Sequence, residues 1–257
     1  MLSIITITYN NFEELISTLY SIPESEKIES IIVNGGDCKK TKEFLLNYKG
    51  KSISEKDNGI ADAFNKGVKL STGKYIMFLN SGDILINPSY LDEAVNILDN
   101  NKNISFTHSN IILFDEDGTE YFVKPTQTNI GRGMPYTHPT MIVRRELFNT
   151  VGMFDTSIRI AMDYDWVVRL EKLNYRGFYI NCDPVVRMNS KGKSVIMEAE
   201  AIKECLIILK KNNYLNFINL TGYIRRVILF SMRKLLISLG LKNVLKFFKK
   251  NKYRFST

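Results

Sequence analysis

Two acidic segments of this sequence combine residue types and positions that suit catalysis. Residues 80–83 (NSGD) follow an apolar run, residues 163–165 (DYD) open a helical pattern, and eighty positions separate Asp83 from Asp163. A carboxylate just beyond a strand can hold a divalent metal ion against a diphosphate. A second carboxylate, from elsewhere in the chain, can remove the proton of an attacking group. The pair therefore suggests transfer chemistry on a phosphorylated donor.

Strand and helix patterns alternate through the first hundred residues. Apolar runs predict strands at residues 2–9, 28–33, 52–55 and 75–79. Helices are predicted from the Asn10-Asn11 pair to Ser21 or Ile22, and at residues 39–48, 59–70 and 89–100. This alternation indicates an α/β fold with a mostly parallel sheet, whose ligands bind at the carboxyl ends of the strands. We therefore expect residues 9–10, 34–37 and 80–83 to form one polar rim.

The alternation breaks after residue 100. Residues 104–114 and 121–123 flank an Asp-Glu-Asp-Gly turn and predict a hairpin, which would place an antiparallel strand at the sheet edge. The remaining expectations are strands at 138–143 and 178–181, helices at 144–151 and 163–173, an irregular loop at 129–136, and helical patterns from residue 194 onward.

Several classes of protein are excluded by what the sequence lacks. No GxGxxG follows the first strand and no GxxxxGK[ST] occurs, so a bound phosphate must be neutralised by a cation or by Lys and Arg side chains. Cys38, Cys182 and Cys205 are scattered, which argues against a disulfide framework or a zinc site. The first residues lack a basic region and a cleavage site, and are expected to be a strand of a cytoplasmic protein.

Longer motifs surround the acidic segments. The first half of the chain contains TITYNN, IIVNGGDCKKT and SEKDNGIADAFNKGVKLSTGKYIMFLNSGD, and the second half contains HPTMIVRRELFNTVGMFD and IAMDYDWVVRL. In this order they resemble the nucleotide-sugar half and the acceptor half of a family 2 glycosyltransferase, over residues 2–194. Within that family the chain is most similar to bacterial enzymes that build O-antigen, capsule or exopolysaccharide. The resemblance implies a GT-A fold, a nucleoside-diphosphate-sugar donor and inversion at the anomeric carbon.

The resemblance assigns three residues to the nucleotide. Tyr9 would pack against the base, as a planar aromatic ring can, although a strand-end tyrosine can also belong to a core. Asn34 stands where the family usually has an Asp that binds the base, and its side-chain oxygen can still accept a hydrogen bond. Asp57 matches a position near the nucleotide, and capping of the next helix is its alternative role.

Residues 80–83 fall at the family's DxD-type metal motif. Asn80 replaces the first Asp and Gly82 occupies the third position, which leaves Asp83 as the expected ligand of Mn²⁺ or Mg²⁺. Such an ion stabilises charge on the leaving diphosphate. The alternative for Asp83 is stabilisation of a turn, a role that Asp often has.

By the same resemblance, Asp163 would be the catalytic base that deprotonates the acceptor hydroxyl. Capping of its helix is the alternative. Asp165 would orient Asp163 or bind the acceptor, and its ordinary partner is Arg169, one helical turn away. His138 is expected to contact the diphosphate or the acceptor, or to be structural. Residues 190–194 (SKGKS) weakly match a loop that closes over the donor.

Residues 195–257 are expected to be a helical basic extension of a GT-A domain at 1–194, itself divided into a nucleotide-sugar half (1–100) and an acceptor half (101–194). From Cys205 onward there are twelve Lys or Arg residues and no Asp or Glu. No uncharged apolar run approaches the ~20 residues that span a bilayer. Basic and apolar faces instead predict attachment to an anionic membrane surface, with packing helices as the alternative and nucleic acid not expected.

Three hypotheses follow from the sequence. The first is an inverting glycosyltransferase, peripheral on the inner face of the cell membrane, that uses a divalent cation to add a sugar to a lipid-linked acceptor or a growing bacterial surface glycan. The second is a sugar-phosphate nucleotidyltransferase, which would normally want a Gly-rich, basic loop after the first strand. The third is a catalytically inactive, membrane-bound nucleotide-sugar binding protein, which the Asn residues at positions 34 and 80 suggest.

Overall fold

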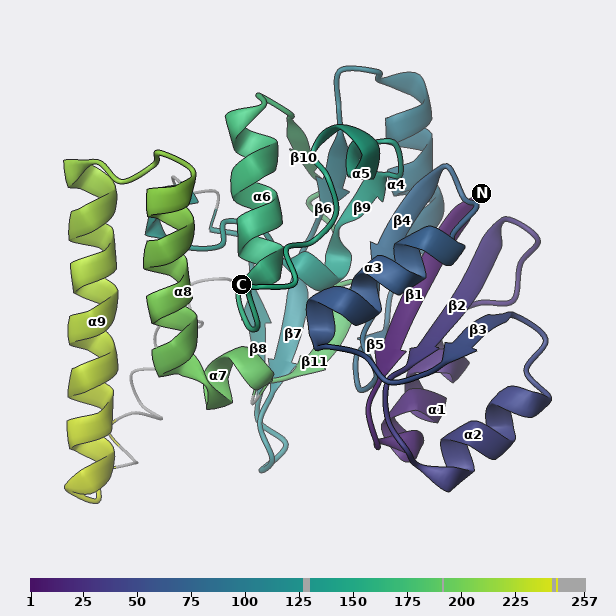
Figure 1. Cartoon of the computed structure of the whole chain (residues 1–257), viewed down its shortest axis with the longest axis horizontal. Coiled ribbons are helices and arrows are strands. Elements are labelled where there is room, and N and C mark those ends of the chain that lie inside the picture. The colour runs from purple at the N-terminus through teal and green to yellow at the C-terminus, as the bar shows by residue number, and fades with distance from the viewer. Residues whose placement is uncertain (127–129, 191, 242–243, 245–257) are drawn as a thin grey trace.

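The computed structural model describes residues 1–126, 130–190, 192–241 and 244. A seven-stranded mixed sheet runs through its centre (Figure 1), in the order β10-β6-β9-β4-β1-β2-β3. Pairing is parallel except for β9, which is antiparallel to both of its neighbours. The strands are β1 (Leu2–Thr8), β2 (Ile28–Asn34), β3 (Lys51–Ser54), β4 (Tyr75–Phe78), β6 (Phe106–His108), β9 (Ile142–Arg144) and β10 (Gly177–Tyr179).

Helices cover both faces of this sheet, as the alternating pattern predicts. Short 3₁₀ turns at η1 (Ile130–Arg132) and η2 (His138–Thr140) interrupt the second half. The helices are α1 (Phe12–Ser21), α2 (Lys39–Leu46), α3 (Ile60–Leu70), α4 (Ser89–Asn100), α5 (Leu147–Thr150), α6 (Met162–Lys172), α7 (Lys193–Ile196), α8 (Glu198–Lys211) and α9 (Phe217–Ser238).

The expected antiparallel hairpin forms between residues 111–114 and 120–123, but it belongs to a second sheet and not to the edge of the large one. Strand β9 lies inside the large sheet, between β4 and β6. The run expected at 104–114 is divided, because Ser109 and Asn110 are fully buried and bond the backbone of Ile180 (2.7 Å) and Cys182 (2.6 Å). Beyond this corner a second sheet forms from β5 (Ile84–Leu85), β11 (Val186–Asn189), β7 (Ile111–Phe114) and β8 (Glu120–Val123).

The strand expected at 138–143 is also shorter than predicted. Its first half is the turn η2, in which Thr140 Oγ1 donates to the carbonyl of Thr137 at 2.9 Å. Pro139 has no backbone N–H and cannot donate a hydrogen bond to a neighbouring strand, so a turn suits this position better than a strand. This turn places His138 beside the end of β4.

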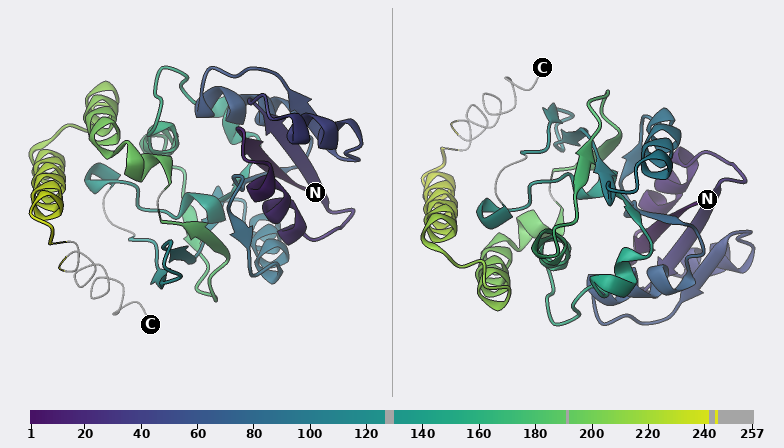
Figure 2. Two further views of the ribbon diagram at one scale, coloured as in Figure 1. Left: turned by 90° about the horizontal axis from the view of Figure 1, so that it is seen from below. Right: turned by 90° about the horizontal axis from the view of Figure 1, so that it is seen from above.

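Helix α8 is packed into the main body rather than free in a tail. Its apolar side chains Cys205, Ile208 and Leu209 are buried in the same cluster as Phe64, Trp166 and their neighbours. Helix α9 lies outside α8, at the end of the molecule opposite β3 (Figures 1 and 2). Residues 242–243 and 245–257 of the expected basic extension lie outside the described residues.

One carboxylate joins the amino ends of four strands. Glu29 of β2 accepts hydrogen bonds from Ser3 Oγ (2.5 Å), from Thr72 N (2.8 Å) and from Lys51 Nζ (2.5 Å). Its side chain is 10% exposed. Burial by itself would raise the pKa of Glu29, but the bonds to Lys51, Ser3 and Thr72 outweigh it and lower this pKa to about 2.

Glu29→Gln is therefore expected to destabilise the fold at neutral pH by about 1–3 kcal/mol, because a charge-assisted cluster loses its anion. The folded-state pKa lies below the usual value of 4.5, so the contribution is complete above pH 4.5 and is lost as the pH falls towards 2. Urea unfolding of the wild type and of Glu29→Gln at pH 7 and pH 3 measures this effect. The same difference in the free energy of unfolding between the two proteins at both pH values would contradict it.

Candidate functional site

The loops that follow β1 and β2 are joined at the carboxyl edge of the sheet, as the expected rim requires. Asn10 adopts a left-handed backbone conformation (φ 57°), which Asn tolerates better than most residues. Its Oδ1 accepts hydrogen bonds from the backbone N–H groups of Asp37 (2.8 Å) and Cys38 (2.9 Å). The sequence places Asn10 in the rim, and the structure adds its role of holding two rim loops together.

Of the residues assigned to the base, Tyr9 is free and Asn34 is engaged. The Tyr9 side chain is 67% exposed at the end of β1, so it is available to a ligand and is not part of the core. Asn34 is fully buried. Its amide nitrogen donates to Gly36 O (3.1 Å) and Ser54 Oγ (2.9 Å), and its oxygen accepts from Gly36 N (3.2 Å). In this conformation Asn34 shapes the loop on which the base would lie.

Asp57 lies against the loop that follows β2. A Cβ atom added to Gly35 would meet Asp57 Oδ2 at 1.6 Å, so only glycine allows this approach. Asp57 Oδ1 accepts a hydrogen bond from Gly59 N at 3.0 Å, and Gly59 is the N-cap residue of α3. The structure thus brings Asp57 to the rim with one carboxylate oxygen engaged in a turn.

Residues 80–83 form a tight turn at the end of β4. Asp83 N donates to Asn80 O (2.9 Å), and Asn80 N donates to Asp83 Oδ2 (3.1 Å). Gly82 has φ 97°, a conformation that favours glycine, and its N–H donates to Thr18 Oγ1 of α1 at 2.9 Å. Asp83 therefore stabilises the turn, and the turn fixes the orientation of the Asp83 side chain.

Two oxygen atoms in this turn suit a hard cation. The Asp83 side chain is buried, and this burial raises the pKa of its carboxyl group to about 7, against the Asn80 N–H bond and with a further increase from the Glu14 carboxylate. Asn80 Oδ1 is buried and has no hydrogen-bond partner among the described residues. Mg²⁺ and Mn²⁺ prefer oxygen ligands and keep several waters, so two protein ligands are sufficient. The residues present therefore fit a divalent ion, although the described part of the chain holds no cluster of three or more His, Cys, Asp or Glu side chains.

His138 connects the end of β4 with the start of α6. Its ring stacks on Phe78, the last residue of β4, with centroids 5.7 Å apart and planes 15° from parallel. Burial lowers the pKa of His138, and the nearby Asp163 carboxylate opposes that decrease. The structure thus brings His138 and Asp163 together, close to the end of the strand from which the turn of Asp83 begins.

Asp163 is the second residue of α6, whose N-cap is Ala161. Its Oδ1 accepts a hydrogen bond from Tyr164 N at 2.7 Å, and the side chain is half-buried. A helix N-terminus favours a carboxylate, because the peptide dipoles place positive charge there. Asp163 therefore lies in the first turn of α6, and Ala161, not Asp163, is the capping residue of this helix.

Asp165 lies apart from this group. It is fully buried and pairs with Arg169 Nε at 2.9 Å, as its spacing in the sequence predicts. The Arg169 guanidinium also donates to the carbonyls of Val151 (2.6 Å) and Met153 (2.9 Å). In this arrangement Asp165 orients Arg169, which fixes the loop before α6, and the structure does not bring it to the rim with Asp163.

A buried amide that sequence reasoning missed ties α3 to the same loop. Asn65 Nδ2 donates to Phe154 O, and Phe154 N donates to Asn65 Oδ1, both at 2.9 Å. An Asn on the inward face of an amphipathic helix was the available signal. Of the segment 190–194, Lys191 lies outside the described residues, and α7 begins at Lys193.

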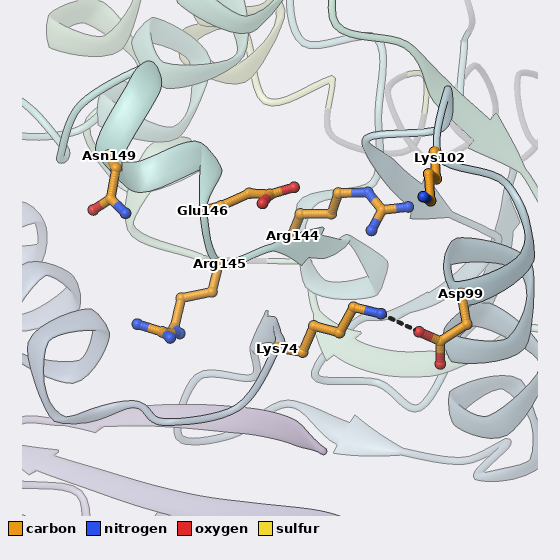
Figure 3. Close-up of a pocket in the computed structure, with 7 residues that line it drawn as sticks. All are labelled: Lys74, Asp99, Lys102, Arg144, Arg145, Glu146 and Asn149. Carbon is orange, nitrogen blue, oxygen red and sulfur yellow. Dashed lines mark hydrogen bonds and ion pairs between the residues drawn. The ribbon is translucent and has the colours of Figure 1, made fainter.

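A polar hollow of about 430 Å³ lies at the opposite end of β4 (Figure 3). Lys74 there forms an ion pair with Asp99, while Arg144 Nε donates to Ile104 O (2.9 Å) and Arg145 Nε donates to Gly73 O (2.8 Å). None of the predicted site residues lines this hollow. Arg144 and Arg145 bond neighbouring backbone and Lys74 pairs with Asp99, which accounts for these four side chains without a ligand.

Comparison with known proteins agrees with this geometry. The family model for glycosyl transferase family 2 matches residues 3–157. An uncharacterised glycosyltransferase of Rickettsia typhi is 28% identical over 181 residues, which cover 64% of this chain and 57% of that protein. A PGL/p-HBAD biosynthesis glycosyltransferase of Mycobacterium tuberculosis is 26% identical over 188 residues, which cover 66% of this chain and 69% of that protein. The chain thus spans little more than half the length of the Rickettsia relative.

Solved structures share the fold at low sequence identity. TarS of S. aureus (residues 1–349) superposes with a TM-score of 0.65 and 16% identity, covering 91% of this chain and 74% of that one. The mannosyltransferase PcManGT of Pyrobaculum calidifontis, in complex with GDP-Man and Mn²⁺, superposes with a TM-score of 0.59 and 15% identity. The match covers 95% of this chain and 80% of that one. The expected GT-A fold is confirmed.

Proposed function

Because the chain belongs to glycosyl transferase family 2, we propose that this glycosyltransferase moves one sugar, with inversion, from a nucleoside-diphosphate sugar to a hydroxyl group of a lipid-linked acceptor or a growing bacterial surface glycan. One observation carries the proposal. The contact of Phe78 with His138, together with the closeness of His138 to Asp163, supports Asp163 as a base that acts near the turn of Asp83.

The exposed rim supports a nucleotide donor. Tyr9 offers an open aromatic face for a base, and Asp57 lies beside the loop after β2. Two structural neighbours were solved with such ligands, TarS with UDP-GlcNAc and PcManGT with GDP-Man. We therefore propose Tyr9, Asn34 and Asp57 as the residues that surround the nucleoside.

Asp83 and Asn80 are the residues that would hold a divalent cation, Mn²⁺ or Mg²⁺. When bound, such an ion supplies positive charge that stabilises the leaving diphosphate. Two described features of the turn support this role, namely the buried Asp83 carboxyl group and the unpartnered Oδ1 of Asn80. PcManGT and GalNAc-T7, both structural neighbours, were solved with Mn²⁺.

Asp163 acts as the base in this mechanism. As the acceptor hydroxyl attacks the anomeric carbon, its proton passes to the Asp163 carboxylate. The bond from Tyr164 N holds the Asp163 side chain in place at the start of α6. His138, whose pKa burial lowers, is present as the neutral imidazole and can position the acceptor or the diphosphate without adding charge.

The two other hypotheses are weaker in the structure. A nucleotidyltransferase would need a Gly-rich basic loop after β1, and the segment there is Tyr9 to Asn11, held by the Asn11 side chain. A catalytically inactive binding protein would bind a donor without turnover on any acceptor. The closeness of His138 to Asp163 favours the active enzyme, because only the transfer reaction needs a base.

Asp163→Asn is expected to lower kcat by about 10²–10⁴-fold, because amide cannot accept the proton, while the donor KM stays within about twofold. Initial rates of nucleoside-diphosphate release, with UDP-GlcNAc or GDP-mannose and a panel of glycan acceptors, measure this. The matched control is Asp92→Asn, the same change in the first turn of α4. Full activity of the Asp163 variant would show that another group is the base.

We further propose that α9 lies on an anionic membrane surface, where a lipid-linked acceptor would be found. Within α9 the only buried residue is Asn219, and the exposed apolar residues include Ile228, Met232 and Leu235. Arg225 and Lys234 are exposed on the same helix, which has no acidic residue. No helix in the described part of the chain is long and apolar enough to cross a membrane, so the helix would lie in the interface.

Vesicle flotation tests this surface. The protein is expected to float with vesicles that contain about 30% anionic lipid, and to stay in the bottom fraction when the vesicles are neutral. The reason is that each basic group contributes about 1 kcal/mol of binding free energy at an anionic surface. Replacing Ile228 and Leu235 by Glu should abolish flotation with no change in Tm, because both side chains are exposed. Dimerisation in size-exclusion chromatography that the same pair of changes abolishes, without flotation, would instead identify a contact between two copies.

A further inference from the structure

Three consecutive backbone N–H groups converge on one carboxylate. Arg159 N donates to Glu204 Oε1, while Ile160 N and Ala161 N donate to Glu204 Oε2, each at 2.9 Å. Such bonds from N–H groups to an ionised acceptor are stronger than neutral ones. Glu204 therefore determines the course of the backbone at residues 159–161.

This backbone leads directly into the helix of the candidate base. Ala161 is the N-cap residue of α6, and Asp163 follows two positions later. Asp165, further along the first turn, is held by Arg169 from within α6. The start of the helix is thus fixed from outside by Glu204 and from inside by the Asp165–Arg169 pair.

Glu204 lies on α8, a helix that is packed against the main core. Its neighbours on α8, Ala201, Cys205 and Ile208, are buried, the last two in the main core. Asn212, just after the end of α8, donates a hydrogen bond to the Asp165 carboxylate at 3.5 Å. Lys211 of the same helix forms an ion pair with Asp155, at the other end of the loop. Helix α8 therefore contacts the loop before α6 at two places, through Glu204 at residues 159–161 and through Lys211 at Asp155.

We propose that Glu204 is a positioning residue for glycosyl transfer, which sets the place of Asp163 by holding the backbone at residues 159–161. This inference rests on the proposed role of Asp163 as the base. Proton transfer requires hydrogen-bond reach, and a misplacement of about 1 Å can cost a hundredfold in rate. Glu204 would act through the backbone and would not contact the donor, so it would affect kcat and not the affinity for the nucleotide.

Glu204→Gln tests this directly. The amide keeps one oxygen and presents N–H groups where the second oxygen stood, so at least one backbone N–H loses its acceptor. We expect kcat to fall about tenfold or more, with the donor KM within about twofold. Glu204→Asp keeps the charge on a shorter side chain and should recover part of the rate. Glu198→Gln, on the same helix but paired with Arg233 of α9, should keep the wild-type kcat.

A double variant separates positioning from general stability. If Glu204 acts through Asp163, Glu204→Gln should cause little further loss in an Asp163→Asn background, since the two losses are not additive. A multiplied loss together with a lower Tm would show a role in stability alone and overturn the inference. If Glu204→Gln fails to fold, Glu204→Asp carries the same comparison in kcat and in the double variant.

The outcomes also separate this inference from the proposed function. Wild-type kcat in the Glu204→Gln protein, with Asp163→Asn impaired, would overturn the role of Glu204 and leave Asp163 as the base. Full activity of Asp163→Asn would overturn the proposed mechanism, whatever the Glu204 variants show.

Discussion

The architecture of this site depends on a carboxylate kept from water at the end of β4. Burial raises the pKa of Asp83 to about 7, so the ionised form is held at a cost that a bound cation would offset. The turn that imposes this burial is fixed by Thr18 of α1 and by the left-handed Gly82. The ends of β1 and β2 then supply the open rim around it, with Tyr9 exposed and Asn34 enclosed.

The second half of the chain has the complementary task of delivering Asp163 to that end of the sheet. Several polar side chains hold the loop before α6, each from a different element, namely Asn65 of α3, Arg169 of α6 and Glu204 of α8. Helix α8 is therefore part of the main body, and α9 lies outside it. This arrangement would connect the proposed membrane surface of α9 with the loop before Asp163, the proposed base.

The parallel half of the fold could be predicted from the sequence because its signals are local, as in the apolar run of β1 and the turn after β4. Strand β9 is shorter than the strand predicted at 138–143, and β5 and β11 were missed, because pairing of such short strands depends on distant partners. Asp163 and Asp83 could be proposed as site residues by motif. The ties from Asn65 and Glu204 could not, since they join residues far apart in sequence, although Ala201, Cys205 and Ile208 have a helical spacing that could have placed α8 in the core.

The central claim is that the turn of Asp83 holds the donor diphosphate through a divalent ion. Calorimetric titration with UDP and with GDP, in Mn²⁺ and in chelator, tests it most directly on the wild-type protein and Asp83→Asn. We expect the preferred nucleotide to bind the wild type at least about tenfold more tightly with Mn²⁺, equivalent to about 1.4 kcal/mol, and the Asp83 variant to lose that difference. Equal affinity of the wild type with Mn²⁺ and with chelator would contradict the account.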